Sequence, residues 1–88
     1  MKSKRIAFLG GGNMAEAIVG GLLAGGVSME RNVVVADVAA DRRALLEGKY
    51  GIGATAKNAA AVRGADVVVL AVKPPQVPEA LAAAREAF

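Results

Sequence analysis

A glycine-rich segment near the start of the chain has residues that could bind a phosphate group. Gly10, Gly12 and Ala15 follow the spacing Gly-x-Gly-x-x-Ala, directly after the apolar residues 6–9 and directly before a helical pattern. In such a turn the first glycine allows a tight bend and the second lets the backbone approach a pyrophosphate. The small third residue lets the helix pack on a sheet, and the unpaired N–H groups at the helix start face the anion. The segment therefore predicts a dinucleotide-binding turn.

An acidic residue lies where such a turn needs one. Asp37 follows the β-branched run of residues 33–36, about 20 residues beyond Ala15, which is the usual interval to the residue that binds the adenosine ribose. A carboxylate there suits a 2′-hydroxyl and repels a 2′-phosphate, which favours NAD over NADP. Arg42 and Arg43 follow closely, and they either reach a 2′-phosphate or are solvated helix charges. Both cofactors, NADP and NAD, therefore stay open.

Two further segments are candidates for ligand contact. Val72, Lys73 and Pro74 follow an apolar run at the point where ligands bind in open parallel sheets, and they would face the nicotinamide half of a dinucleotide. The alternative for Lys73 is that it is only the first exposed residue after a buried strand. Asn58 opens a short helical pattern, and its residue type alone favours an ordinary N-cap.

The elements that must position these residues alternate along the chain. We expect strands at residues 5–9, 33–36, 53–55 and 67–72, and helices at 13–24, 41–50, 58–63 and 79–88. This alternation predicts an α/β fold of the Rossmann type, a three-layer parallel sheet in the order 3-2-1-4 with helices on both faces. The last strand is almost wholly apolar and should be buried on both faces. Asp41 should N-cap the second helix, and Met14, Ile18 and Leu22 share one face of the first.

Composition narrows the chemistry further. The 88 residues form at most one small domain, and 55% of them are apolar with a mean hydropathy of +0.41. Because the chain has no cysteine and no histidine, disulfides, thiolate catalysis, the common zinc sites and histidine general-base chemistry are excluded. No catalytic residue and no metal site is expected. No apolar run approaches the roughly 20 residues of a membrane span, and no secretion signal is seen, so we expect a cytoplasmic protein. A net charge of +3 with three aromatic residues does not favour nucleic-acid binding.

The two glycine-bearing segments together resemble a known family. Residues 10–15, Gly-Gly-Gly-Asn-Met-Ala, and residues 64–74, Gly-Ala-Asp-Val-Val-Val-Leu-Ala-Val-Lys-Pro, resemble the N-terminal domain of pyrroline-5-carboxylate reductase. The resemblance implies reduction of the imine of 1-pyrroline-5-carboxylate to L-proline with NADPH or NADH. It also implies a set of cofactor-binding residues: Leu9, Gly10, Gly11, Gly12, Asn13, Met14 and Ala15 at the pyrophosphate, Asp37 and Asn58 at the adenosine, and Val72, Lys73 and Pro74 at the nicotinamide.

Two departures from the family pattern bear on function. Members that prefer NADPH often carry a small polar residue where this chain has Asp37. The family's C-terminal domain, a helical dimerisation unit that supplies most of the substrate pocket, is not found in residues 1–88. We therefore expect one dinucleotide-binding domain of a homo-oligomeric enzyme, inactive alone. The alternatives are a β-hydroxyacid dehydrogenase or deazaflavin-dependent NADP reductase domain, against which Val-Lys-Pro argues, and a non-catalytic nucleotide-binding module.

Overall fold

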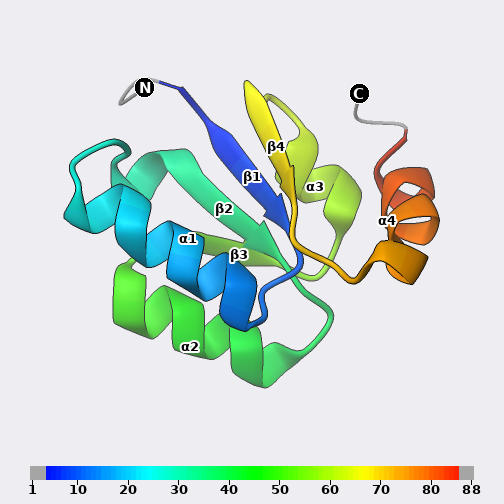
Figure 1. Cartoon of the computed structure of the whole chain (residues 1–88), viewed down its shortest axis with the longest axis horizontal. Helices are drawn as coiled ribbons and strands as arrows, with labels where there is room; N and C mark the ends of the chain where they lie inside the picture. Colours follow the sequence, from blue (N-terminus) through cyan, green and yellow to red (C-terminus); the bar gives the residue numbers. More distant parts are fainter. Residues whose placement is uncertain (1–3, 86–88) are drawn as a thin grey trace.

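A computed structural model describes residues 4–85 of the chain and places strands and helices in alternation (Figure 1). Two 3₁₀ turns, Glu30–Asn32 and Pro74–Gln76, lie between the main elements. The main elements are β1 (Ile6–Leu9), α1 (Asn13–Ala24), β2 (Val33–Ala36), α2 (Ala40–Tyr50), β3 (Gly53–Thr55), α3 (Asn58–Val62), β4 (Val67–Leu70) and α4 (Val77–Ala84).

The four strands form one parallel sheet in the order β3-β2-β1-β4. The predicted fold class and strand order are therefore confirmed. Leu9 at the end of β1 pairs with Ala36 of β2 and Leu70 of β4, and Ala36 pairs with Thr55 of β3. The carboxyl ends of all four strands consequently meet at one edge of the sheet, which is where loops that bind ligands lie in this type of fold.

The core consists of two layers on opposite faces of the sheet, because successive side chains of a strand point to opposite sides. Helices α1 and α2 cover one face, and α3 and α4 cover the other (Figure 1). The first layer contains the larger side chains: Ile6, Phe8, Ala15, Val19, Val33, Val35, Leu46 and Ile52. The second layer is rich in alanine: Ala7, Leu9, Ala36, Ala61, Val62, Ala80 and Ala84.

The face of α1 that carries Met14, Ile18 and Leu22 packs only in part, because Leu22 contacts the core layer and the other two are exposed. Ala15 and Val19 are fully buried, whereas Met14 is 54% exposed and Ile18 is 38% exposed. The prediction was wrong for Met14 and Ile18 because α1 is apolar on more than one side, so periodicity alone does not select the buried face. The small side chain of Ala15 is the one in contact with the sheet, as the glycine-turn motif requires.

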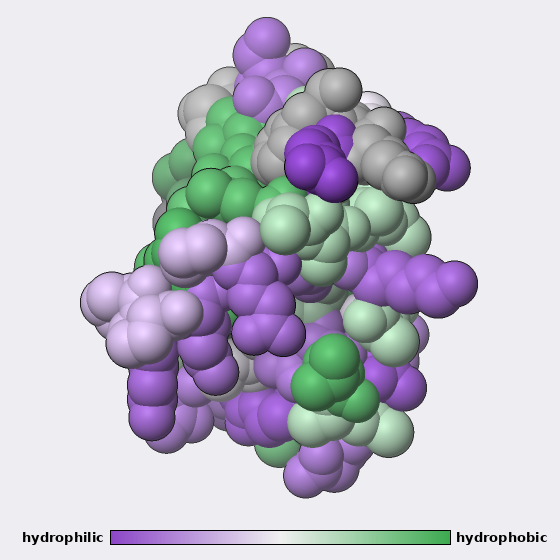
Figure 2. Space-filling view, turned by 90° about the vertical axis from the view of Figure 1, so that its right-hand side faces the viewer, coloured by the Kyte–Doolittle hydropathy of each residue, from purple (hydrophilic) through white to green (hydrophobic). Residues whose placement is uncertain are grey.

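Strand β4 is shorter and more exposed than expected. It ends at Leu70, and the side chains of Val67 and Leu70 are each 37% exposed. The expectation of burial on both faces was wrong because β4 lies at an edge of the sheet, where it pairs with β1 alone among the described strands. Figure 2, which views the side of the molecule on the right of Figure 1, shows hydrophobic surface gathered at the upper left.

Two helix starts also differ from the expectation. Helix α2 has Ala39 at its N-cap, so Asp41 lies in the first turn instead. The carboxylate that organises this start is Asp37, whose Oδ1 accepts the Ala39 N–H at 2.8 Å. Helix α4 begins at Val77 rather than at residue 79, directly after the 3₁₀ turn that Pro74 opens. Its predicted end at Phe88 lies outside the described residues.

Among residues 4–85 no helix is long and apolar enough to cross a membrane.

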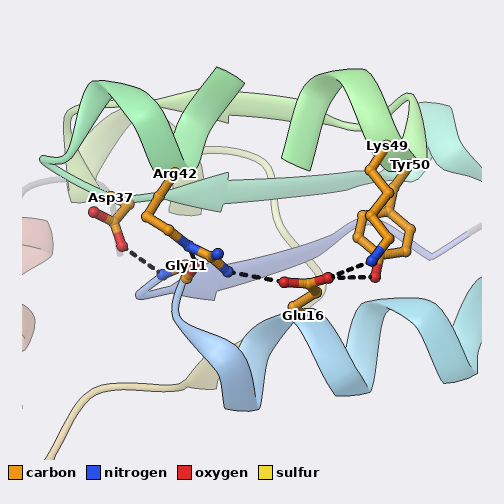
Figure 3. Close-up of polar contacts among 6 residues, drawn as sticks. All are labelled: Gly11, Glu16, Asp37, Arg42, Lys49 and Tyr50. Atoms are coloured by element: carbon orange, nitrogen blue, oxygen red, sulfur yellow. Dashed lines mark hydrogen bonds and ion pairs between the residues drawn. The ribbon is translucent and has the colours of Figure 1, made fainter. Parts of the chain in front are cut away.

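A network of polar side chains links α1 to α2. The carboxylate of Glu16 on α1 accepts hydrogen bonds from Arg42 Nη2 at 3.1 Å, Lys49 Nζ at 2.8 Å and Tyr50 Oη at 2.9 Å (Figure 3). Hydrogen bonds from Lys49, Tyr50 and Arg42 stabilise the charged form, and they lower the pKa of Glu16 from 4.5 to about 2 against the opposing effect of burial. One carboxylate therefore holds both ends of α2.

The lowered pKa predicts a pH-dependent contribution to stability. A carboxyl group whose pKa is lower in the folded than in the unfolded chain stabilises the fold above its unfolded pKa, and this contribution is lost as the pH falls through the folded pKa. Glu16→Gln should therefore reduce the free energy of unfolding most near neutral pH, and the difference from wild type should shrink between about pH 5 and pH 2. Urea unfolding at a series of pH values measures this difference in the free energy of unfolding. Glu47→Gln, on the exposed side of α2, is the control. A difference that is constant with pH would contradict the assignment.

Candidate functional site

The glycine turn is held tightly between the ends of β2 and β4. Gly10 has φ +107°, and a Cβ atom there would lie 2.6 Å from the carbonyl oxygen of Ala71. The Gly10 N–H donates to the Ala36 carbonyl at 2.8 Å. Glycine at position 10 is therefore a requirement of the fold itself, because any side chain would meet both backbone strain and a steric clash.

Gly12 is different, because the fold has no need of a glycine there. Its φ is −79°, which any residue can adopt, and a Cβ atom at this position would have nothing within 4 Å. Gly12 is the N-cap of α1 and no side chain caps the helix. The first N–H groups of a helix have no intrahelical acceptor, and they carry the positive end of the helix dipole. Gly12, Asn13 and Met14 are exposed at this point, so the turn offers backbone donors to an anion.

A groove of about 600 Å³ lies along the carboxyl edge of the sheet. Four of the predicted site residues line it, namely Gly10, Asp37, Asn58 and Val72. Sequence reasoning missed its other lining residues: Ala36, Val38, Ala56, Lys57, Ala59, Gln76, Glu79, Ala80 and Ala83.

Some of the missed residues carry a signal in the sequence. The residues that α4 and the turn before it contribute are spaced by three and four positions, which marks one face of a helix. Val38 directly follows Asp37 and is 87% exposed, which is unusual for a large apolar side chain. The helical spacing is visible in the sequence, whereas the exposure of Val38 is known only from the structure.

Asp37 is fixed at the junction of the glycine turn and the groove. Its backbone N–H donates to the Thr55 carbonyl at 2.9 Å, which ties the end of β2 to β3. Its Oδ2 accepts the Gly11 N–H at 2.8 Å, and its Oδ1 accepts the Ala39 N–H at 2.8 Å. A carboxylate has about four lone-pair sites, so two remain for hydroxyl donors in the groove.

The two arginines after Asp37 are not free helix charges, because both bond to backbone carbonyls. Arg42 Nε donates to the Gly11 carbonyl at 2.7 Å, and Arg43 Nη1 donates to the carbonyls of Asp37 and Val38, both at 3.0 Å. Backbone carbonyls in a turn outside regular structure need donors, and the arginines supply them. Both guanidinium groups are thus engaged with the backbone rather than freely solvated.

Asn58 links the two helices on the groove side. It is the first residue of α3, and Lys57 occupies the N-cap position, so the N-cap interpretation was wrong. The Asn58 Nδ2 instead donates to the Ala80 carbonyl of α4 at 3.3 Å. This bond fixes the Asn58 side chain at the groove wall.

The remaining predicted residues lie around the turn in different environments. Val72 lines the groove, with its Cγ1 3.0 Å from the Cβ position of Gly10. Lys73 and Pro74 are exposed just beyond it, where the Lys73 N–H donates to Gln76 Oε1 at 3.2 Å. Leu9 and Ala15 are fully buried, so their side chains support the turn and do not face the groove.

The groove presents a small set of polar groups to a ligand. They are backbone amides of the glycine turn and the side chains of Asp37, Lys57, Asn58, Gln76 and Glu79. Among residues 4–85 no cluster of three histidine, cysteine or acidic side chains could hold a metal ion.

The chain is similar to a known protein family, to curated sequences and to solved structures. The model of a family described as NADP oxidoreductase, coenzyme F420-dependent, matches residues 5–88. A pyrroline-5-carboxylate reductase of Pseudomonas aeruginosa is 47% identical over 74 residues, which is 84% of this chain and 27% of the relative. A solved pyrroline-5-carboxylate reductase from Coxiella burnetii superposes with a TM-score of 0.84 at 39% identity, covering 90% of this chain and 29% of that one. The Plasmodium falciparum pyrroline carboxylate reductase with NADP bound has a TM-score of 0.80 at 20% identity, over 98% of this chain and 30% of its own, and shows likeness of fold.

The chain thus spans less than a third of the length of these relatives. The predicted resemblance to pyrroline-5-carboxylate reductase is confirmed by the relatives' names and identities. The description of the matching family names coenzyme F420, which is a deazaflavin. We expected the Val72-Lys73-Pro74 sequence to argue against the deazaflavin-dependent class, but the match shows that it does not exclude this family. With its glycine turn, sheet order and matched residues, the chain belongs to the family of coenzyme F420-dependent NADP oxidoreductases.

Proposed function

We propose that this chain is the NAD(P)H-binding domain of an enzyme that reduces 1-pyrroline-5-carboxylate to L-proline. The observation that carries the proposal is Gly12, an exposed glycine that the fold does not require, at the start of a helix and two residues after Gly10, which lines the groove. A glycine of this kind is explained by a ligand that must approach the backbone closely. The relatives named pyrroline-5-carboxylate reductase support the choice of substrate.

Each part of the groove has a role in this proposal. The pyrophosphate accepts hydrogen bonds from the amides of Gly12, Asn13 and Met14. The adenosine ribose donates its hydroxyls to Asp37, and the adenine lies between Val38 and Asn58. The nicotinamide extends past Gly10 towards the segment of Val72, Lys73 and Pro74. When bound, the reduced cofactor supplies the hydride for the imine carbon, and the protein supplies binding and orientation.

The rest of the enzyme completes the site in this proposal. The loop after β4 forms one wall for the imine, and a C-terminal helical domain of the longer protein forms the other and joins the copies of a homo-oligomer. Residues 1–88 then act as the dinucleotide-binding domain. In this proposal the enzyme is located in the cytoplasm, where reduced nicotinamide cofactors are used in biosynthesis.

Replacement of Gly12 tests the phosphate site. Gly12→Val should leave the fold intact, because a Cβ at this position has no atom within 4 Å. It should weaken NADH and NADPH binding by roughly a hundredfold, since the side chain blocks the approach of the pyrophosphate. Calorimetric titration measures both dissociation constants, and thermal unfolding checks the fold. Gly48→Val on α2 is the matched control, because a Cβ there also has nothing within 4 Å. Equal binding by a folded Gly12→Val variant would refute the placement of the phosphate.

Asp37 should decide between the two cofactors. Asp37→Asn keeps the size of the side chain and one acceptor oxygen but removes the charge. We expect NADH binding to weaken by roughly tenfold and NADPH binding to weaken less or improve, because a like charge next to the 2′-phosphate is lost. The ratio of the two dissociation constants is the measurement. Glu79→Gln removes another carboxylate that lines the groove and should leave the ratio unchanged. An unchanged ratio in Asp37→Asn would mean that the ribose binds elsewhere.

A chimera tests the substrate. The chain should bind NAD(P)H by itself but not reduce pyrroline-5-carboxylate, because an open half-site forfeits most of the roughly 7–11 kcal/mol that alignment of the reactants can contribute. When it replaces the matching segment of the Pseudomonas aeruginosa reductase, pyrroline-5-carboxylate should oxidise the cofactor again. The rate of absorbance loss of the reduced nicotinamide reports both cases. A folded chimera that binds NADPH yet remains inactive would argue against this substrate.

A further inference from the structure

The two peptide groups on either side of Gly11 are held by side chains from the segment that follows β2. The Gly11 N–H donates to Asp37 Oδ2 at 2.8 Å, and the Gly11 carbonyl accepts from Arg42 Nε at 2.7 Å. Arg42 is itself oriented by Glu16, whose Oε1 lies 3.1 Å from Arg42 Nη2 (Figure 3). We call Asp37, Arg42 and Glu16 the turn clamp.

Holding the Gly11 carbonyl also sets the direction of the next amide. The peptide between Gly11 and Gly12 is planar and trans, so its C=O and N–H point in opposite directions. Because Arg42 draws the carbonyl towards α2, the Gly12 N–H is directed away from α2. The surroundings of Gly12 are open as well, because a Cβ built on this residue would have nothing within 4 Å.

The geometry of the guanidinium group suits this double contact. Its donors form a rigid planar fork, so Arg42 can serve the Gly11 carbonyl through Nε and the Glu16 carboxylate through Nη2 at once. A lysine ammonium would carry the same charge without this fork. The side chains of Arg42 and Glu16 are only 24% and 19% exposed, so solvent screens the pair less than it screens a free surface pair.

A run of three glycines makes such a clamp necessary. Glycine has the largest backbone freedom to lose, so a Gly10-Gly11-Gly12 turn with no tether would populate many conformations. Binding a pyrophosphate would then cost the ordering of the turn at each encounter. Side-chain contacts made before the ligand arrives remove that cost.

We propose that Arg42 and Glu16 are positioning residues for pyrophosphate binding: with Asp37, they fix the glycine turn so that its amides already face the phosphate oxygens. The inference rests on the proposed function, because it assigns a pyrophosphate to this turn. It also concerns the choice between NADH and NADPH. Arg42 acts on the part that NADH and NADPH share, and not on the 2′-phosphate that distinguishes them.

Variants of Arg42 separate this role from a simple charge effect. Arg42→Met and Arg42→Lys should each weaken NADH and NADPH binding by the same factor, roughly tenfold, because both lose the forked donor. Binding of adenosine 2′-monophosphate, which has no pyrophosphate, should change little. Glu16→Gln should produce a smaller loss in the same direction. Calorimetric titration with the three probes gives these values.

Two outcomes of the titrations would overturn the proposal. Full rescue of binding by Arg42→Lys would mean that Arg42 acts through its charge. A loss confined to NADPH and adenosine 2′-monophosphate would make Arg42 a ligand of the 2′-phosphate.

A measurement on the ligand-free chain keeps the clamp testable even if no dinucleotide binds. ¹⁵N relaxation should show that the amides of Gly11 and Gly12 become more mobile on the picosecond-to-nanosecond timescale in Arg42→Met, while those of β1 do not change. If wild type binds neither cofactor, the proposed function fails, and the relaxation data still decide whether the clamp orders the turn. If wild type binds but the turn is equally rigid in Arg42→Met, the clamp is refuted and the proposed function stands.

Discussion

The close packing of Gly10 between the ends of β2 and β4 is the constraint on which the rest of the site depends. Its N–H is bonded to Ala36, and the Ala71 carbonyl occupies the space that a side chain would need. The chain must therefore bend sharply as soon as β1 ends. That bend places the start of α1 at the carboxyl edge of the sheet, with Ala15 buried in the core and Gly12 exposed.

The polar contacts between α1 and α2 solve the problem that this bend creates. A turn made of glycines is flexible, and its carbonyls lie outside any regular hydrogen-bond pattern. Arg42 and Arg43 bond to carbonyls of the turn and of the end of β2, and Glu16 holds Arg42 in place. Asp37 tethers Gly11 and also lines the groove, so in the proposed complex the same carboxylate would meet the ribose. Structure and ligand binding thus depend on the same few side chains.

Much of the fold could be predicted from the sequence, because short apolar runs and glycine stops mark its elements clearly. The sheet order and the glycine turn are of this kind. Contacts between distant segments could not be predicted from the sequence. The bond from Asn58 to Ala80 joins two helices, and the arginines bond to backbone carbonyls, which leave no trace in a residue pattern. The buried face of α1 was missed because Met14 and Ile18 are as apolar as the residues that pack.

The central claim is that a dinucleotide binds with its pyrophosphate on the glycine turn. The most direct measurement is a titration of the ¹⁵N-labelled chain with NADH, followed through the amide chemical shifts. We expect the largest shifts at Gly12, Asn13 and Met14, with smaller ones at Asp37 and Asn58 along the groove. Shifts confined to the smaller hollow near the amino ends of the strands, which Arg5 and Arg63 line, would contradict it.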